Sequence, residues 1–369
     1  RRPKGEEPEM LAARSLRKAH IPTTLLGDPS PGSIQPTRLA IHVKGDGNGE
    51  SSSCSIYVAS GCQVYRLEVS NEGSSPVKGK DSLLVPAGAQ VTQSSVVDRC
   101  PHRSEIQSIA LAERDDDTCI LLGTVDSFGH LIVSRLDANG ADIDRHSYTI
   151  APRGYGVGEG SWAGICFSPI YSSTAATVHS LCKSIDVYDH DIHLCSFQTI
   201  WYPNSLSFLQ CSQLGGGSSS VLAVAEGSQL TIWDLRTSGG CVQRVCGSIG
   251  DLIYAISSSP SGAVAAGGSD RTVTIYDPRR WSALSRWVGC SKYEVTFLFL
   301  HVYLITGLAF SSLNSDYMFS VDDGKRAGEH FHLEGTQTGW DARTDVLAGW
   351  CDSGSIFVAD IVKEQEESL

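Results

Sequence analysis

Two short sequences in the second half of the chain have the residue types and the spacing that suit partner binding. Each runs aromatic residue, aspartate, any residue, arginine, and they read Trp233-Asp234-Leu235-Arg236 and Tyr276-Asp277-Pro278-Arg279. An arginine guanidinium forms bidentate, charge-assisted hydrogen bonds with a carboxylate of another protein. The two sequences therefore predict charged docking points at Arg236 and Arg279.

Each sequence ends a longer pattern of sixteen residues. The two copies of this pattern, 221–236 and 264–279, align with one another without a gap. Each copy has two short apolar, β-branched runs around a turn of small and polar residues. The turns are Glu226-Gly227-Ser228 in the first copy and 267–270 in the second, and this arrangement predicts a β-hairpin. One hairpin cannot bury its own apolar face, so the pattern predicts further hairpins stacked beside it.

The spacing of the two aromatic residues resembles that of a known repeat family. Trp233 and Tyr276 are 43 residues apart, and a repeat of this length that ends in Trp-Asp is similar to the WD-repeat, or transducin-like, family. The resemblance implies an all-β chain folded as a β-propeller of about seven four-stranded blades. It also implies a non-catalytic scaffold that binds other proteins.

The doubled pattern further resembles a box found in propellers that dock onto the adaptor of cullin-RING ubiquitin ligases. That box carries an acidic residue before the aromatic one, and Asp270 stands there in the second copy, whereas the first copy has Gly227. The resemblance implies a ligase substrate receptor with these partner-binding residues: Trp233, Asp234, Arg236, Asp270, Tyr276, Asp277 and Arg279. The alternative is a structural subunit of an unrelated nuclear or cytoplasmic assembly, in which the aromatic residues pack between blades and the arginines are solvated.

The rest of the chain supplies further units of alternating apolar residues. They cover 55–68, 106–137, 162–189, stretches that open at Leu206 and Ile253, 306–324 and 345–361. The Gly-His pair that usually precedes the inner strand in this family is absent before Trp162, Ile253 and Ile305, so stability is expected to come from packing. Lys325 to Arg343 offers no clear inner strand for the last blade, so either N-terminal residues close the ring or this blade is degenerate.

The apolar run from Val295 to Phe310 interrupts the repeat spacing. It is too short for a membrane span and rich in β-branched and aromatic residues, so we expect a strand pair. Removing 295–304 restores the repeat period, which predicts that these ten residues are an insertion at the edge of a blade.

The termini are expected to lie outside the propeller, which we place at 38–361. Glu6 to His20 has acidic residues first and basic residues last, as in a short helix, and a Pro- and Ser-rich linker follows, giving an N-terminal segment of 1–37. This helix either docks on a partner or packs on its own domain. Residues 362–369 form an acidic tail.

Composition narrows the classes of partner. The 369 residues carry a formal net charge of −12, which argues against a general nucleic-acid or anionic-membrane binder, although a basic patch of Arg279, Arg280, Arg286 and Lys292 remains an alternative. The 12 cysteines include no CxxC pair, which indicates free thiols and an intracellular protein, nuclear or cytoplasmic or both. Protein partners are therefore expected, and the oligomeric state is left open.

No catalytic constellation is present in the sequence. It contains no GxSxG, P-loop, HExxH or zinc-binding cysteine pair, so we expect neither an enzyme nor a cofactor. Two histidine pairs, His190 with His193 and His330 with His332, suit either a metal or an ordinary polar turn or strand. The glycines at 154, 156, 158 and 160 predict a mobile loop rather than a phosphate cradle. A propeller enzyme would need acids, histidines or metal ligands gathered at the central channel.

Overall fold

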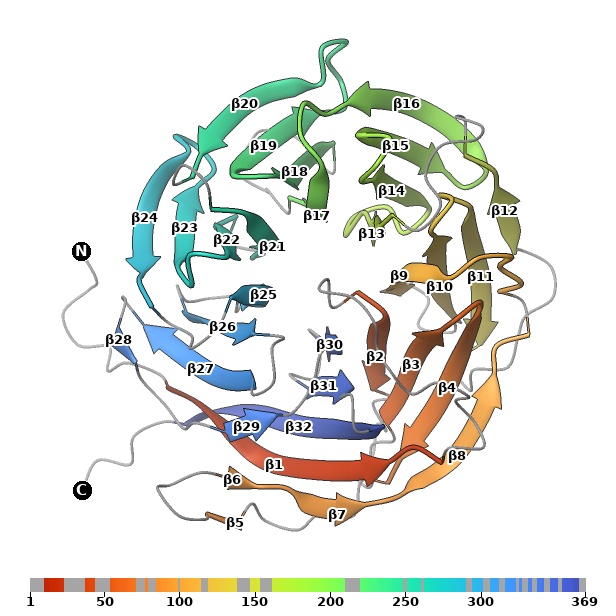
Figure 1. The fold of residues 1–369 in the computed structure, drawn as a ribbon, viewed down its shortest axis with the longest axis vertical. Helices are drawn as coiled ribbons and strands as arrows, with labels where there is room; N and C mark the ends of the chain where they lie inside the picture. Colours follow the sequence, from red (N-terminus) through yellow and green to blue (C-terminus); the bar gives the residue numbers. More distant parts are fainter. Residues whose placement is uncertain are drawn as a thin grey trace.

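The structure is a computed structural model of the chain. It describes residues 10–22, 37–43, 54–70, 77–78, 84–98, 100–113, 119–137, 147–152, 161–209, 220–247, 251–259, 262–289, 294–300, 306–311, 316–322, 325–326, 331–333, 337–341, 346–350 and 354–364. Within these ranges every regular element is a β-strand, and no helix could cross a membrane. The sheets stand around a central axis like the blades of a propeller (Figure 1).

Five sheets in the described part of the chain have four strands each, and within each one strands that are consecutive in sequence pair antiparallel. The first of these sheets along the chain has β2 (Leu39–Val43), β3 (Cys54–Ser60), β4 (Gln63–Val69) and β8 (Val91–Val96). The second has β9 (Ile106–Glu113), β10 (Cys119–Asp126), β11 (Leu131–Asp137) and β12 (Tyr148–Ile150). The third has β13 (Ala163–Phe167), β14 (Thr174–His179), β15 (Ser184–Asp189) and β16 (Ile192–Gln198).

The two copies of the doubled pattern fall in the fourth and fifth of these sheets. The fourth has β17 (Pro203–Phe208), β18 (Val221–Glu226), β19 (Gln229–Asp234) and β20 (Cys241–Cys246). The fifth has β21 (Ile253–Ser258), β22 (Val264–Gly268), β23 (Val273–Asp277) and β24 (Ser282–Trp287). Each copy is therefore a hairpin of the second and third strands, as predicted.

The remaining described strands form two larger sheets. A seven-stranded sheet holds β25 (Val295–Leu300), β26 (Thr306–Ser311), β27 (Asp316–Asp322), β28 (Lys325–Arg326), β29 (Phe331–Leu333), β6 (Leu84–Val85) and β5 (Val77–Lys78). A five-stranded sheet holds β30 (Gln337–Asp341), β31 (Val346–Trp350), β32 (Ser355–Glu364), β1 (Met10–His20) and β7 (Ala87–Ala89). The all-β prediction is confirmed, but the predicted number of about seven regular four-stranded blades is too high.

The N-terminal segment is a strand and not the predicted helix. β1 pairs antiparallel with β32, with Leu16 opposite Ala359, and the pairing extends to Glu364, inside the segment expected as an acidic tail. Leu16 is fully buried. The charge order favours a helix, but the free edge of β32 needs a hydrogen-bonding partner, and this non-local pairing outweighs the local preference. Residues 365–369 lie outside the described residues.

The segment that follows β4 reaches the two larger sheets at the outside of the ring (Figure 1). β7 pairs parallel with β1, and β6 pairs parallel with β29. This arrangement explains why these two sheets have more strands than the others. The polar composition of residues 71–80 predicts an exposed loop, and the pairing of β5 with β6 corrects this expectation for the two residues of that range that the structure describes.

The predicted insertion at 295–304 is wrong for the residues that the structure describes. Val295–Leu300 is β25, the first strand of its sheet, and it lies at the inside of the ring (Figure 1). Val295 is fully buried and packs with Val273 and Trp287 of the neighbouring sheet. The last sheet also has an inner strand, β30, within the polar stretch where none was apparent, and it pairs with β31.

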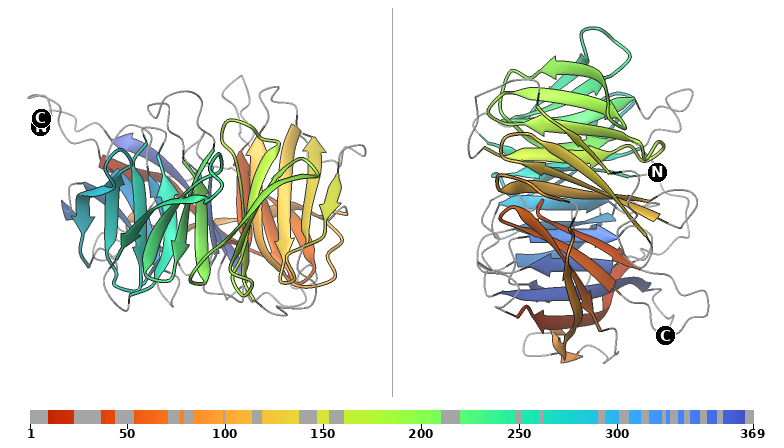
Figure 2. Two further views of the ribbon diagram at one scale, coloured as in Figure 1. Left: turned by 90° about the horizontal axis from the view of Figure 1, so that it is seen from above. Right: turned by 90° about the vertical axis from the view of Figure 1, so that its right-hand side faces the viewer.

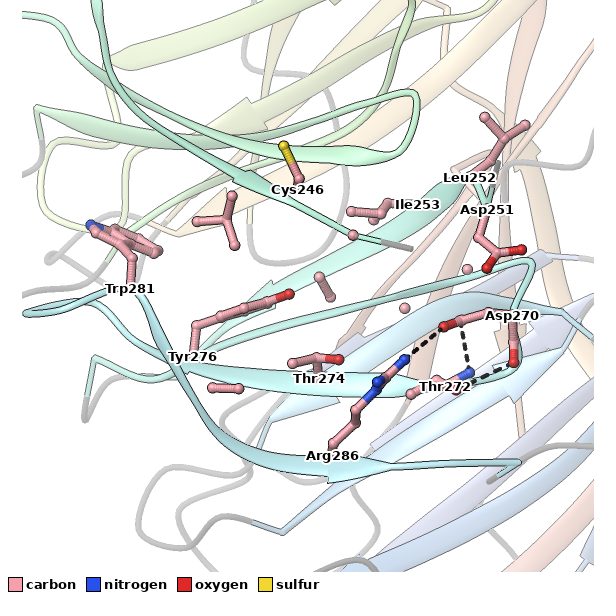
Figure 3. A pocket seen from close by; sticks show the side chains of 16 residues that line it. Cys246, Asp251, Leu252, Ile253, Asp270, Thr272, Thr274, Tyr276, Trp281 and Arg286 are labelled. Carbon is pink, nitrogen blue, oxygen red and sulfur yellow. Dashed lines mark hydrogen bonds and ion pairs between the residues drawn. The ribbon is translucent and has the colours of Figure 1, made fainter. Parts of the chain in front are cut away.

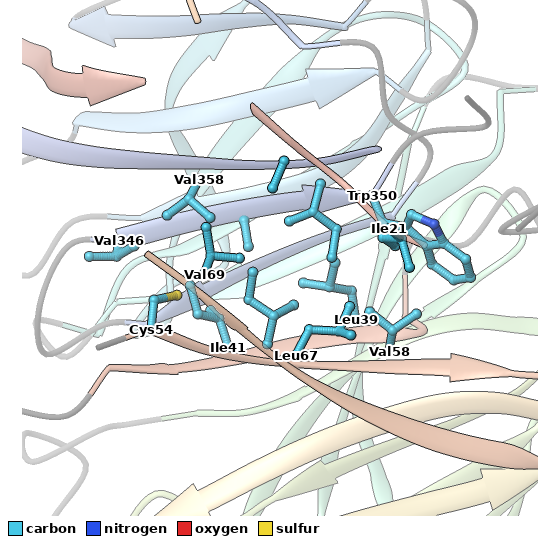
Figure 4. Packing of buried hydrophobic residues seen from close by; sticks show 14 of the residues in the cluster. Ile21, Leu39, Ile41, Cys54, Val58, Leu67, Val69, Val346, Trp350 and Val358 are labelled. Atoms are coloured by element: carbon cyan, nitrogen blue, oxygen red, sulfur yellow. The ribbon is translucent and has the colours of Figure 1, made fainter. Parts of the chain in front are cut away.

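Apolar side chains from neighbouring sheets pack face to face around the ring. The cluster in Figure 4 joins the first sheet to the five-stranded sheet, with Leu39, Val58 and Leu67 against Trp350 and Val358. Full burial of each such side chain contributes roughly 1.5–3 kcal/mol. The first and last sheets along the chain thus hold one another through a continuous apolar core.

The strands run across the thickness of a disc, so loops and turns gather at its two faces (Figure 2). In each four-stranded sheet the first strand begins at one face, and the turn between the second and third strands lies at that same face. The turns after the first and third strands lie at the other face. Trp201 precedes β17, the first strand of the fourth sheet, and Arg236 follows β19, its third strand, so the two residues lie at opposite faces. We therefore call these faces the Trp201 face and the Arg236 face.

Candidate interaction site

The two aromatic residues of the doubled pattern are core residues. Trp233, at 2% exposure, packs against Phe197 of the preceding sheet with 5.6 Å between ring centroids. Its indole Nε1 donates to Thr231 Oγ1 at 2.9 Å. Tyr276 is buried in the equivalent place, between the fourth and fifth sheets, and burial raises its pKa. Both aromatic side chains thus pack neighbouring sheets together. Their contact with a partner stays a prediction.

Asp234 and Arg236 already bind one another. The guanidinium donates from Nε to Asp234 Oδ1 at 2.9 Å and from Nη2 to Oδ2 at 2.8 Å, so both carboxylate oxygens are used. The backbone amide of Arg236 also donates to Oδ1, at 3.0 Å. Hydrogen bonding from this side chain lowers the pKa of Asp234. A partner carboxylate would therefore have to compete with Asp234 for this guanidinium.

Asp277 and Arg279 are arranged differently. Asp277 Oδ1 accepts the backbone amide of Arg279 at 2.9 Å, which repeats the turn of the first copy. The Arg279 side chain is exposed, and among the described residues its guanidinium has no ion-pair partner. Of the two predicted docking arginines, Arg279 is the one whose charge is open to a partner.

Asp270 does not join Arg279 in one site. Asp270 precedes β23 and Asp277 ends it, and a five-residue strand separates its ends by roughly 13 Å. The carboxylate of Asp270 accepts the backbone amide of Thr272 at 2.9 Å and lies 3.7 Å from Arg286 Nη2. The seven predicted residues are therefore divided between the core, the Arg236 face and the opposite end of the second hairpin.

Two buried polar networks, which no sequence pattern predicted, lie at the second and fourth sheets. In the second sheet the His102 ring lies 3.2 Å from Asp126 Oδ2 through Nδ1 and 2.7 Å from Thr124 Oγ1 through Nε2. Burial alone would raise the pKa of Asp126, but the hydrogen bonds and charges of His102 and His130 outweigh it and lower the pKa to about 2. Stability in this blade thus depends on a charged network as well as on packing.

A second network is centred on Glu226, at the end of β18. This carboxylate is fully buried. Its Oε1 accepts a hydrogen bond from Thr231 Oγ1 at 2.6 Å, and its Oε2 lies 3.2 Å from Arg244 Nη1. Oε2 also accepts the backbone amides of Ile200 at 3.0 Å and Trp201 at 3.4 Å. Glu226 was read from the sequence as a turn residue, yet it ties the fourth sheet to the connection that precedes it.

The connection held by Glu226 presents three large apolar side chains to solvent. Ile200, Trp201 and Tyr202 lie between β16 and β17 and are 57%, 53% and 51% exposed. The backbone is fixed at both ends, because Thr199 N donates to Lys183 O at 2.7 Å and Gly227 N donates to Tyr202 O at 3.2 Å. We call Ile200–Tyr202 the aromatic loop. Its signal in the sequence was three adjacent large apolar residues between two predicted strands.

Other exposed apolar residues lie at the same face of the disc. Leu181 in the β14–β15 turn and Phe128 in the β10–β11 turn are both more than a third exposed, as is Leu252 in the connection before β21. The Lys183 ammonium lies 4.8 Å from the centre of the Tyr202 ring. The Trp201 face thus carries apolar side chains over several adjacent sheets.

His190 and His193 do not point to a shared ligand position. His190 lies 3.2 Å from Asp189, whereas His193 contacts Ser196 at 2.7 Å and Asp186 at 3.6 Å. Among the described residues no three His, Cys, Asp or Glu side chains converge as metal ligands would. His330, Lys292 and the four alternating glycines lie outside the described residues.

Comparison with known proteins rests on structure, because no family model and no curated protein matches the sequence. The structure resembles that of Raptor from Chaetomium thermophilum, with a TM-score of 0.62, 11% identity and coverage of 98% of this chain and 29% of that chain. It also resembles a chain of the mitotic checkpoint complex, with a TM-score of 0.60, 12% identity and coverage of 98% and 96%. This chain thus spans less than a third of the Raptor chain. At these identities the likeness shows the fold alone, which is an all-β fold of the propeller kind.

Proposed function

We propose that this chain is a non-catalytic scaffold that binds other proteins within a multiprotein complex, through the aromatic loop on its Trp201 face. The observation that carries the proposal is the combination of exposure and rigidity: Ile200, Trp201 and Tyr202 are about half exposed, yet a fully buried Glu226 holds their backbone. Trp and Tyr dominate the binding energy of many interfaces, and a pre-organised segment loses little entropy when it binds.

Two further observations support this proposal. One of the similar structures is a chain within a complex, the mitotic checkpoint complex. In addition, β1 and β32 pair within one sheet that packs on the first, and we infer that this pairing closes the ring of blades. A closed ring gives the loops of one face a rigid base.

Every cysteine that the structure describes is free, which supports an intracellular location, nuclear or cytoplasmic.

The test compares two double variants of the intact chain, each of which removes two exposed large apolar side chains, on opposite faces. Trp201→Ala/Tyr202→Ala removes the aromatic loop, and Ile170→Ala/Tyr171→Ala removes the pair that is 47% and 57% exposed in the β13–β14 connection. We expect the first variant to lose its specific partners in affinity capture read by mass spectrometry. The second is expected to retain them. Equal capture by the two variants, with both folded, would overturn the proposed site.

The finer proposal is a substrate receptor of a cullin-RING ubiquitin ligase, docked through the Arg236 face. Its support is the exposed guanidinium of Arg279, which has no ion-pair partner among the described residues, in a chain that carries the pattern twice. The aspartate of the first copy already binds Arg236. The two arginines therefore give different expectations for adaptor binding.

Single alanine variants distinguish a docking role from an architectural one. We expect Arg279→Ala to lower capture of the ligase adaptor about tenfold or more, because a charge-assisted bond of roughly 1.5–3 kcal/mol is lost. Arg236→Ala should have a smaller effect, since Asp234 competes for that guanidinium. Absence of the adaptor from wild-type capture would leave the scaffold without a ligase role.

A further inference from the structure

A cavity of about 430 Å³ lies between the fourth and fifth sheets (Figure 3), and Leu252 of the Trp201 face is part of its lining. One wall comes from the end of β20, Gly247 and 251–253, and the other from β22, β23 and β24. The two walls therefore bring together neighbouring sheets of the ring. The proposed scaffold function does not use this cavity.

The two ends of the cavity differ in chemistry. Asp251 and Asp270 lie at one end, Trp281 lies at the other, and the hydroxyl of Tyr276 points into the space between them (Figure 3). Among the described residues that line the cavity, Arg286 carries the single guanidinium or ammonium, so the described carboxylates outnumber the described cations. Asp251 has no hydrogen bond or ion pair with any residue that the structure describes.

The acidic end is held in place by backbone contacts. Leu252 N donates to Ser269 Oγ at 2.8 Å, and Ser269 N donates to Leu252 O at 2.9 Å, so the residues next to Asp251 and Asp270 are tied together. The close approach of the Leu252 backbone to residue 268 requires a glycine there, because a Cβ at this position would lie 1.8 Å from Leu252 O. The backbone that carries the two carboxylates is thus fixed at this end of the cavity.

We propose that this cavity binds an arginine side chain of a partner protein. A planar guanidinium bonds carboxylates through several N–H groups, so it suits the acidic end, and the rest of the arginine side chain lies along the aromatic rings of the lining. An anion would face Asp251 and Asp270, and an apolar side chain would leave Asp251 without a cation. The proposal adds a partner chemistry to the scaffold function and rests on that function only for the identity of the partner.

Arg286 acts as the internal competitor for this site. Its side chain is 54% exposed, and its Nη2 lies 3.7 Å from Asp270 Oδ2, a long separation for an ion pair. A partner arginine displaces it at little cost, because an exposed pair of this kind contributes about 1 kcal/mol or less. Removal of Arg286 should therefore strengthen binding, whereas removal of either carboxylate should weaken it.

The test uses small probes, so its outcome is independent of partner capture. The chain is labelled with 5-fluorotryptophan, the Trp281 resonance is assigned with Trp281→Phe, and N-acetyl-arginine amide is titrated against N-acetyl-citrulline amide, its neutral isostere. We expect the arginine probe alone to shift the Trp281 resonance. Asp251→Asn and Asp270→Asn should each raise the Kd about tenfold, which corresponds to the loss of ~1.4 kcal/mol.

Two arginine variants test whether Arg286 competes with the probe. Arg286→Gln is expected to lower the Kd of the arginine probe several-fold. Arg271→Gln changes an exposed residue in the same turn as Asp270 that does not line the cavity, and it should leave the Kd unchanged. The other fluorotryptophan resonances report whether each variant is folded. Equal shifts with the citrulline probe, or weaker binding after Arg286→Gln, would overturn the proposal. Failure of the aromatic-loop capture test would leave this result untouched.

Discussion

Glu226→Gln is expected to lower the free energy of unfolding by about 2–4 kcal/mol, because it disrupts a fully buried charge network. The carboxylate accepts hydrogen bonds from Thr231 and from the amides of Ile200 and Trp201, and it pairs with Arg244. An amide side chain has only one oxygen, so its NH₂ group would face other donors. The same change should also release the backbone of the aromatic loop and weaken partner capture.

Urea unfolding followed by circular dichroism measures this effect, with Glu105→Gln as the matched control. The Glu105 side chain is 51% exposed, and its contact with Arg38 survives as a hydrogen bond to the new amide oxygen. Arg38 is buried and also loses its counter-ion in the control, but the Glu105 carboxylate is reached by solvent, so we expect a smaller loss than for the fully buried Glu226. Equal losses for the two variants would show that Glu226 is not a structural charge.

Asp126→Asn is expected to cost about 2 kcal/mol at neutral pH. The folded protein lowers the pKa of Asp126 from 3.8 to about 2, and each pKa unit corresponds to about 1.4 kcal/mol. Because the folded pKa lies below the unfolded one, this stabilisation is fully present above the unfolded pKa. It is lost as the pH falls from about 4 through about 2.

The pH dependence distinguishes this electrostatic contribution from a packing defect. Unfolding free energies of the wild type and Asp126→Asn should differ most at pH 6–7 and converge as the pH falls below about 4. Asp189→Asn, at an exposed carboxylate beside His190, serves as the matched control and should change little. A difference between the wild type and Asp126→Asn that stays constant down to the acid limit would contradict the charged network at His102.

The sequence predicted the hairpins well because their signal is local. Val221–Glu226 pairs with Gln229–Asp234 across a two-residue turn, and alternating apolar residues reveal both strands. The N-terminal strand had no such signal. Its residue Ser15 bonds Asp360, a contact across 345 positions, and no local pattern in Met10–His20 points to that partner. Pairing between the chain ends is set by the free edge of β32.

The strand pair expected in the apolar run from Val295 is present as β25 and β26. The predictions of an insertion at β25 and of no clear inner strand before β31 were wrong for a related reason. Inner strands are short, and whether such a segment forms a strand depends on the neighbouring strand that it can pair with. Gln337–Asp341 therefore forms a strand beside β31 despite its polar residues. Val295–Leu300 looked like an insertion because repeat spacing was assumed to be constant. Val295 is buried against the preceding sheet, which shows that the spacing varies while the packing is kept.

The site was predicted in part. The sequence identified Arg236 and Arg279 as equivalent, yet only the first is bound by its own aspartate side chain. The pairing depends on side-chain conformation at each turn, which the repeated residue pattern does not determine. The aromatic loop was overlooked because exposed apolar residues next to a strand look like strand residues. Its exposure becomes apparent only when Glu226 is placed beneath it.

Hydroxyl-radical footprinting of the wild-type chain, alone and with its captured partner, tests the central claim most directly. Trp201 and Tyr202 report on one face, and Tyr171, at 57% exposure, reports on the other. We predict that the partner slows oxidation of Trp201 and Tyr202 and leaves Tyr171 unchanged. Protection of Tyr171 with unchanged Trp201 and Tyr202 would contradict the account and would place the binding surface on the Arg236 face.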